Sequence, residues 1–359
     1  MSARTGPVRL GAIGCGGFGM GVHFPAISTI PELKLTAFCD VDANRASSAA
    51  QRFGVSAIFQ DFREMLDSCE LDALCVVGPP ALHVAAAKEL LARQIPFFTE
   101  KPLATNVEDA REIAALATKH GDCGQIGYTS RYSPAQRLAW RITRAKEFGP
   151  ISDVTATHLT QSPMYPVWDK EDPVEAFIHL NGVHAIDLWR FFGGDPVEVA
   201  ASVSAKRQLD DGTFLGSVLV YVRTGDGPHG TIRMKAGSAH NGDVSSDVSG
   251  EHTRVKVENG QSLSYEGGRE WITQTMAGDP LEGMFLADQP VGRFVHTGLI
   301  SHTYLHDFFR FEWIAFAHAV LAGTPLSPST IEGCKTAFLT DAICRSLREG
   351  GKVTRVEYG

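Results

Sequence analysis

The sequence predicts two domains of different fold class: an α/β domain with a parallel sheet, followed by an α+β domain with an antiparallel sheet. The chain has 359 residues, which is more than one hydrophobic core usually serves. In the first third, short apolar runs alternate with helix-length segments, whereas longer runs of alternating polar and apolar residues follow after about Gly127. The first pattern indicates βαβ units, and the second indicates a sheet with one covered face. We therefore expect domains at residues 1–127 and 128–359.

The first domain is predicted element by element from its apolar runs. Strands are expected at residues 8–14, 34–40, 73–77, 95–99 and 122–126. Segments with helical spacing lie between them, at residues 22–29, 43–53, 82–93 and 107–120. Strands that alternate with helices of this length predict a parallel sheet with helices on both faces.

The second domain is predicted from longer strands framed by helices. Strands are expected at residues 151–160, 197–207, 214–223, 229–237 and 252–258, and helices at 134–148, 182–192, 303–321 and 329–348. Residues 241–250 and 267–286 fit loops and irregular strands equally well. The chain contains no internal repeat and no low-complexity linker.

Charge and cysteine content narrow the class of partner and the compartment. The formal net charge is −8 and no long basic run is present, which argues against a nucleic-acid or anionic-membrane surface and favours small-molecule partners. The seven cysteines are scattered and form no C-x-x-C pair, so neither a disulfide framework nor a thiolate zinc site is expected. Glycines interrupt the apolar N-terminus, and no apolar run is long enough to span a membrane. We expect a cytoplasmic protein.

A glycine motif at the end of the first strand predicts a dinucleotide site. Gly14, Gly16 and Gly19 form G-x-G-x-x-G, in which the glycines permit a tight turn, backbone approach to a pyrophosphate, and close helix packing. Gly17 and Phe18 complete the loop. Asp40 ends the second strand, where a carboxylate binds ribose hydroxyls and repels a 2′-phosphate, so NAD is favoured over NADP. Arg45 keeps NADP open, and a glycine turn without a ligand is the alternative.

Four further segments resemble one enzyme family. They are G-P-P-A-L-H at residues 78–83, E-K-P at 100–102, R-Y-S-P at 131–134 and G-V-H-A-I-D at 182–187. With the glycine motif, they closely resemble the Gfo/Idh/MocA oxidoreductases. The resemblance implies a Rossmann domain joined to a domain with a large, mostly antiparallel open sheet. It also implies NAD or NADP as cofactor, sugars, inositols or related alcohols as substrates, and a homodimer or homotetramer formed through the C-terminal sheet.

The same resemblance implies two catalytic residues. Lys101 lies at the family's catalytic lysine, and an ammonium group there would stabilise developing alkoxide charge. His184 lies at the catalytic histidine, and neutral imidazole would take a hydroxyl proton. Pro79, His83, Glu100 and Lys101 are expected near the cofactor. A surface lysine and a helix-start histidine packed on the sheet are the plainer alternatives.

The chain departs from the family pattern at one position. Many of its dehydrogenases carry an aspartate four residues before the histidine, whereas this chain has Leu180 there, between His179 and Asn181. Either neighbour can substitute in orienting His184 or in binding substrate, and a change of substrate or reaction is equally consistent. Asp187, one helical turn after His184, can instead fix the tautomer of its ring, or serve as a cap or core residue.

Weaker candidates complete the expected site. Tyr165 and Trp168 lie in a proline-containing segment, where aromatic faces beside polar groups suit a sugar ring, although an ordinary loop fits as well. Arg131 is expected either to reach substrate or to form a structural ion pair. The spacing of His296, His302 and His306 can serve a metal, but without matching carboxylates no metal is expected.

These observations predict hydride transfer between NAD and a secondary alcohol of a sugar, glycoside or cyclitol, with Lys101 and His184 as the acid–base pair. Two alternatives stay open. One is a redox-neutral reaction, such as glycoside cleavage or epimerisation, in which tightly held NAD is reduced and then reoxidised. The other is a non-catalytic protein that senses NAD.

Overall fold

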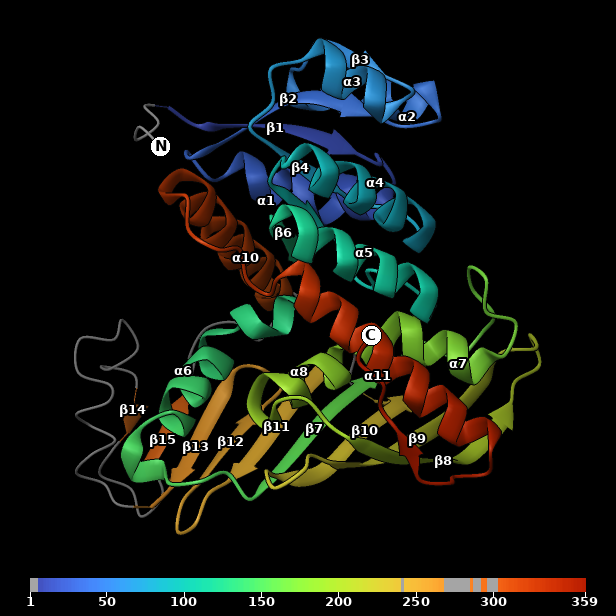
Figure 1. Ribbon diagram of the computed structural model, residues 1–359, viewed down its shortest axis with the longest axis vertical. Coiled ribbons are helices and arrows are strands. Elements are labelled where there is room, and N and C mark those ends of the chain that lie inside the picture. Colours follow the sequence, from blue (N-terminus) through green and yellow to red (C-terminus); the bar gives the residue numbers. More distant parts are fainter. Residues whose placement is uncertain (1–5, 240–241, 268–284, 287–291, 296–302) are drawn as a thin grey trace. The chain divides into compact units, whose positions relative to one another are not determined.

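The computed structural model divides the chain into two compact units (Figure 1). It describes residues 6–239, 242–267, 285–286, 292–295 and 303–359. The first unit holds residues 1–129 with 301–337, and the second holds residues 130–300 with 338–358. Residues 301–337 thus group with the N-terminal unit, although the boundary expected from the sequence assigns them to the second domain.

The first unit is built on a parallel sheet of six strands among the described residues, in the order β3-β2-β1-β4-β5-β6. The strands are β1 (Val8–Ile13), β2 (Leu33–Cys39), β3 (Ala57–Phe59), β4 (Ala73–Val76), β5 (Phe97–Thr99) and β6 (Gly124–Ile126). The α/β class and the five expected strands are confirmed, and β3 is added as an edge strand. The order reverses beside β1, so the loops after β1 and β4 meet at the crevice where open α/β sheets bind ligands.

Helices cover both faces of this sheet. They are α1 (Phe24–Ser28), α2 (Ala43–Phe53), α3 (Phe62–Ser68), α4 (Pro80–Arg93), α5 (Val107–His120) and α10 (Thr303–Ala322). Local signals set their ends: the Asp42 side chain accepts a hydrogen bond from the Asn44 amide at the start of α2, and Gly54 ends that helix with φ +69°. From α10, Trp313 and Phe316 join the buried core of this unit.

The second unit is built on a mostly antiparallel open sheet, and its described residues supply ten strands in the order β14-β15-β13-β12-β11-β7-β10-β9-β8-β16. The strands are β7 (Asp153–Thr160), β8 (Glu198–Gln208), β9 (Phe214–Arg223), β10 (His229–Ala236), β11 (Asp243–Ser249), β12 (Arg254–Glu258), β13 (Ser262–Glu266), β14 (Phe285–Leu286), β15 (Gly292–Val295) and β16 (Thr354–Arg355). Only the β7–β10 pair among them is parallel. The predicted antiparallel class is confirmed.

One central strand, β11, forms in a segment whose sequence fits a strand and a loop equally well. β11 is rich in serine and aspartate, which have low strand propensity, yet it pairs with β7 on one side and β12 on the other. Pairing on both edges satisfies its backbone groups, and Val248 enters the core. Tertiary pairing therefore overrides local propensity here.

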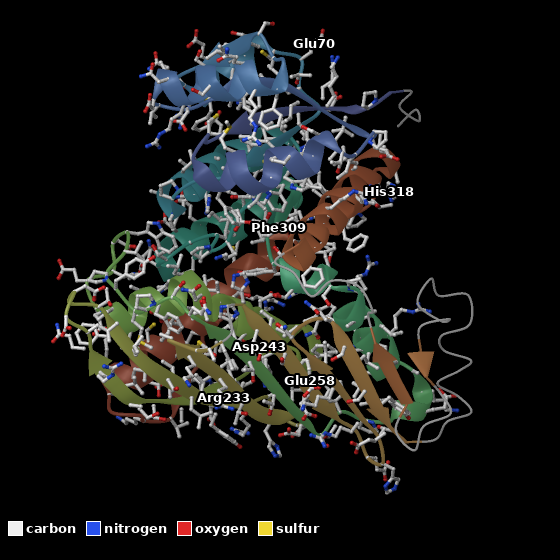
Figure 2. The ribbon with its side chains drawn as sticks, turned by 180° about the vertical axis from the view of Figure 1, so that it is seen from behind. Glu70, Arg233, Asp243, Glu258, Phe309 and His318 are labelled. Atoms are coloured by element: carbon white, nitrogen blue, oxygen red, sulfur yellow. The ribbon has the colours of Figure 1, made fainter. Side chains whose placement is uncertain are left out.

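Helices cover one face of the second sheet (Figure 1). They are α6 (Pro134–Thr143), α7 (Pro173–Phe177), α8 (Val183–Gly193) and the C-terminal part of α11 (Thr330–Arg348). Trp189 of α8 is fully buried, and its indole N–H donates to the Val154 carbonyl at 2.8 Å. Charged side chains such as Arg233 lie exposed on the other face of this sheet. Figure 2, which views the molecule from behind, labels Arg233. Among the described residues, no helix combines the length and apolar character that crossing a membrane requires.

Candidate active site

The glycine loop after β1 has the geometry that a dinucleotide pyrophosphate requires. Gly14 has φ +89°, and a Cβ atom there would lie 2.0 Å from the Val77 carbonyl oxygen. At Gly16 and Gly17, a Cβ atom would meet nothing within 4 Å. At Gly19 it would lie 2.9 Å from the ring of Phe24. The first glycine therefore makes the turn, the middle two leave the backbone open to a ligand, and the last permits close packing, so the residues present fit the phosphates.

The helical segment that follows begins with a π-helical turn, Gly19–His23, which runs into α1. π-Helical turns are rare and occur frequently at functional sites. Phe18, just before this turn, is 44% exposed, and its ring edge meets His23 with ring centroids 5.1 Å apart. An exposed aromatic ring at a glycine loop is available to pack on a bound ligand.

Asp40 connects the end of β2 to the glycine loop. One carboxylate oxygen accepts the Cys15 amide at 2.7 Å and the other accepts the Asp42 amide at 2.9 Å. Each carboxylate oxygen has room for a further bond, so two ribose hydroxyls can still be bound. Arg45 pairs with Asp42 at 3.5 Å. A fixed negative charge at this place disfavours a 2′-phosphate.

His83 links the loops that follow β4 and β5. Its Nε2 accepts the Gly78 amide at 3.3 Å, and its Nδ1–H donates to the Pro102 carbonyl at 2.9 Å. This pairing requires neutral imidazole, and burial lowers the ring's pKa accordingly. The structure thus uses both ring nitrogens of this predicted cofactor residue to tie two loops together. Pro79, beside it, directly precedes the first residue of α4.

Glu100 and Lys101 begin the loop after β5, and the Lys101–Pro102 peptide is cis. One oxygen of the buried Glu100 carboxylate accepts the Lys101 amide at 3.0 Å, and the other lies 3.0 Å from His23 Nε2. Burial would raise the pKa of this carboxyl, but the bond from His23 and the Lys101 charge outweigh burial and lower it. Burial lowers the pKa of Lys101, against the opposing charge of Glu100. A lysine whose pKa is lowered suits acid–base work.

In the second unit, a π-helical turn, Ile178–Gly182, joins α7 to α8 and carries Leu180 and Asn181. His179, also in this turn, is buried, and burial lowers its pKa to about 3. Among the described residues, its Nδ1 has no hydrogen-bond partner. Buried polar atoms are nearly always bonded to protein, water or ligand, so this nitrogen is available to a polar ligand.

His184 lies in the first turn of α8, half-buried, beside a histidine that the sequence analysis missed. The ring of His158 on β7 lies 5.1 Å from the ring of His184, tilted by 32°. On β7, Val154, Ala156, His158 and Thr160 all point to the buried face. The sequence signal that could have identified His158 is its place at an inward-facing position of a strand with alternating burial.

Arg131 forms a structural ion pair within the second unit. Its guanidinium binds both oxygens of the buried Asp187 carboxylate, at 2.7 and 2.6 Å, and lies over the ring of Phe191. This bidentate pair supports the ion-pair alternative for Arg131, and its role toward substrate stays a prediction. Each Asp187 oxygen accepts one bond from Arg131, and the role of Asp187 in fixing the His184 tautomer stays a prediction. The neighbouring Tyr132 is buried.

Tyr165 and Trp168 are each 39% exposed on a loop of the second unit. Backbone bonds in both directions between Val167 and Lys170 close a tight turn, and Trp168 occupies it with φ +55°. A non-glycine residue in the left-handed region is strained, and such strain concentrates at functional sites. The structure therefore presents these rings to solvent, as stacking on a sugar would require.

The sequence predicts no metal at its three spaced histidines, and the structure describes this group only in part. His296 and His302 lie outside the described residues, and the side chain of His306 in α10 is likewise not described. Within the described part of the chain, no three histidine, cysteine or acidic side chains gather as a metal site.

A parallel six-strand sheet with an open glycine loop at its switch point defines the first unit as a dinucleotide-binding Rossmann domain. Family models match both units: the oxidoreductase family with NAD-binding Rossmann fold over residues 8–128, and the GFO/IDH/MocA C-terminal domain over residues 136–256. The chain belongs to the Gfo/Idh/MocA family of oxidoreductases, as its motifs predict.

Curated relatives and solved structures agree with this assignment. An inositol 2-dehydrogenase from Rubrobacter xylanophilus is 24% identical over 96% of this chain and 92% of its own length. An oxidoreductase of Bacillus subtilis, YrbE, is 29% identical, over 56% of this chain and 58% of that protein. A levoglucosan dehydrogenase solved with NADH and levoglucosan has the same fold, with a TM-score of 0.79, 21% identity, and coverage of 98% of this chain and 99% of that one.

Proposed function

We propose that this protein is an NAD(H)-dependent dehydrogenase that acts on a secondary alcohol of a sugar, glycoside or cyclitol. One observation carries the proposal: the loop that bears Lys101 is fixed to the same edge of the sheet as a glycine loop shaped for pyrophosphate. The inositol 2-dehydrogenases among its relatives support the polyol substrate class.

Each catalytic candidate has a defined chemical task. A bound nicotinamide supplies the hydride acceptor. The Lys101 ammonium stabilises the negative charge that develops on the reacting oxygen, and it returns to the neutral amine readily because burial lowers its pKa. The imidazole of His184 accepts the hydroxyl proton, and His158 restricts the orientation of its ring. His179, Asn181, Tyr165 and Trp168 are the candidates for substrate hydroxyls and ring faces.

The cofactor is NAD in this proposal, because Asp40 places a bound negative charge where NADP would bring its 2′-phosphate. A screen of sugars, glycosides and inositols, followed by NADH absorbance and run with both NAD and NADP, tests substrate class and cofactor together. We expect turnover of at least one polyol with NAD. Turnover with NADP alone would overturn the cofactor choice.

Substitution of Lys101 tests the enzyme assignment. Lys101→Ala should lower kcat by about 10²–10⁴-fold, the usual contribution of a general acid–base group, while NAD affinity measured by calorimetry stays within a few-fold. Lys101→Arg keeps the charge but not the compact ammonium, so it should recover little. A variant that keeps full turnover would remove Lys101 from the mechanism. No turnover in the parent protein, with NAD bound, would support the sensor alternative.

Leu180 favours a second candidate, a redox-neutral reaction in which retained NAD oxidises and then reduces the same sugar. Leucine cannot bind or orient a polar group as the aspartate common in dehydrogenases of the family does. Mass spectrometry of the purified protein tests this alternative. Cofactor retained through purification, with product formed and no net NADH, would select it over the dehydrogenase.

We propose further that the protein forms a homodimer or homotetramer through the outer face of the second sheet. Leu219 and Tyr221 are 49% and 47% exposed there, two residues apart on the strand β9. Exposed apolar side chains that cluster on one sheet face mark an interaction surface. Light scattering of the parent protein and of Leu219→Glu checks this, since a charge at the centre of the contact should release monomers.

A further inference from the structure

A buried triad of side chains in the first unit ends on the backbone of Lys101. The indole N–H of Trp313, on α10, donates to His23 Nδ1 at 3.0 Å. The other ring nitrogen of His23 lies 3.0 Å from one Glu100 oxygen, and the second Glu100 oxygen accepts the Lys101 amide at 3.0 Å. His23 and Trp313 are fully buried, and Glu100 is 5% exposed.

The hydrogen-bond directions fix the protonation state of this triad. An indole nitrogen is only a donor, so His23 Nδ1 must accept and carries no proton. His23 Nε2 therefore holds the single ring proton and donates it to Glu100. The Lys101 amide is also only a donor, so the second Glu100 oxygen must accept as well. These bonds require neutral His23, and an ionised Glu100 accepts both of its bonds without a carboxyl proton that would need a partner of its own.

The surroundings of His23 exclude water. Its ring meets Phe18, Phe98 and Phe309, with ring centroids 5.1 to 5.3 Å away; Phe309 is marked in Figure 2. A hydrogen bond in such an apolar shell is stronger than one in water, and an unpaired carboxylate there is costly. Trp313 also packs on Phe98 at 4.4 Å, so the same helix supplies both the apolar shell and the donor.

We propose that Trp313 and His23 are positioning residues for Lys101: Trp313 fixes the tautomer of His23, and His23 holds the Glu100 carboxylate that anchors the Lys101 backbone. The loop is then held at both ends, because His83 binds the carbonyl of Pro102, the next residue. The titratable groups around Glu100 are His23, Lys101 and His83, and buried Glu312 directly precedes Trp313 on α10. This inference rests on the proposed role of Lys101.

Nitrogen NMR of the whole protein, labelled at histidine and with NADH bound, tests the tautomer without any substrate. His23 should show the neutral Nε2–H form throughout the pH range in which the protein is folded around neutrality. In Trp313→Phe, which keeps the packing and loses the donor, Nδ1 no longer accepts a hydrogen bond, so its nitrogen resonance should shift and the single Nε2–H tautomer should no longer be fixed. A doubly protonated His23, or an Nδ1–H tautomer, in the parent protein would overturn the proposal.

Kinetics then separate positioning from packing. His23→Phe leaves one Glu100 oxygen buried without its donor, and kcat should fall roughly 10- to 100-fold, the equivalent of a lost bond to a charged group, with KM nearly unchanged. His23→Gln restores an N–H donor and should recover part of kcat. Phe316→Leu, on the same helix and in contact with Trp313, is the packing control and should alter neither kcat nor the His23 tautomer.

The two proposals fail in different ways. If Lys101→Ala keeps full turnover, the role of Lys101 fails, while the tautomer of His23 still reports whether the triad exists. If Lys101→Ala abolishes turnover but His23→Phe and Trp313→Phe match the parent in kcat, the triad is only structural and the positioning role is overturned.

Discussion

The buried histidines of the two units differ in how their ring nitrogens are bonded. In the first unit, His23 and His83 each use both nitrogens within the protein, and each ring connects separate elements around the Lys101 loop. In the second unit, His179 is equally buried, yet its Nδ1 has no partner among the residues that the structure describes. One site is complete in itself, and the other has an open hydrogen-bonding position.

This difference matches what each site must recognise. The pyrophosphate is the same in NAD and NADP, so the loops that hold it can be fixed by backbone geometry and bonded side chains. Substrates vary, and the second unit offers replaceable side chains at its candidate positions: Leu180 and Asn181 in a π-helical turn, and Tyr165 and Trp168 on an exposed loop. We infer that the fold of the first unit determines cofactor binding, whereas side-chain identity in the second determines the substrate.

The largest effect is expected from Gly14→Ala. A Cβ atom 2.0 Å from the Val77 carbonyl oxygen, at φ +89°, forces the backbone apart, and we expect a loss of about 4 kcal/mol or more in the free energy of unfolding. Gly17→Ala is the matched control: its Cβ meets nothing within 4 Å, so stability should be unchanged while NAD affinity falls. Denaturant unfolding and calorimetry measure both. Equal stability of the two variants would contradict the backbone account.

A smaller loss is expected from Asp187→Ala in the second unit. Removing one partner of a buried pair leaves the Arg131 guanidinium uncompensated, at a cost of about 3–5 kcal/mol in the free energy of unfolding. The double variant Arg131→Met with Asp187→Leu removes both charges and should recover most of that stability. If the double variant is stable but its KM for substrate rises more than tenfold, Arg131 also contacts substrate.

The pH dependence of stability tests the open position at His179. Its folded pKa of about 3 lies below the unfolded value near 6.5, so below pH 6.5 the unfolded chain takes up a proton that the folded chain does not. Stability is therefore lost as pH falls, by about 2 kcal/mol between pH 6.5 and 5. His179→Gln should lack this part of the acid dependence in denaturant unfolding at each pH. An unchanged slope would show that His179 is hydrated.

The sequence was most informative where local signals are strong. α2, α5 and β9 have the bounds that capping residues and periodicity predict, and the glycine motif predicts the turn at Gly14. The missed features depend on tertiary contacts. β11 is a strand because two neighbours pair with it, and α10 groups with the first unit because Trp313 and Phe316 complete that core. Neither partner is visible in the local sequence.

The same limit applied to individual side chains. His23 lies between the motif glycines and α1 and carries no local sign that Glu100 and Trp313 bind it, because its partners are 77 and 290 residues away along the chain. The pairing of Arg131 with Asp187 was one of two open alternatives, since a buried ion pair and a substrate contact require the same residue type. The geometry shows the ion pair, and the substrate contact stays a prediction.

The smallest effect is expected at Trp168, where strain and exposure coincide. A tryptophan at φ +55° pays a conformational cost that glycine does not, so Trp168→Gly should raise the free energy of unfolding by about 0.5–1 kcal/mol. If the ring binds substrate, KM should rise by about tenfold, the usual worth of a stacking contact. Trp168→Ala loses the same ring but keeps the strain, so KM should rise with no gain in stability. A gain in stability without any change in KM would show that Trp168 serves only the loop structure. The proposal that side chains of the second unit determine the substrate would then rest on His179 and Asn181.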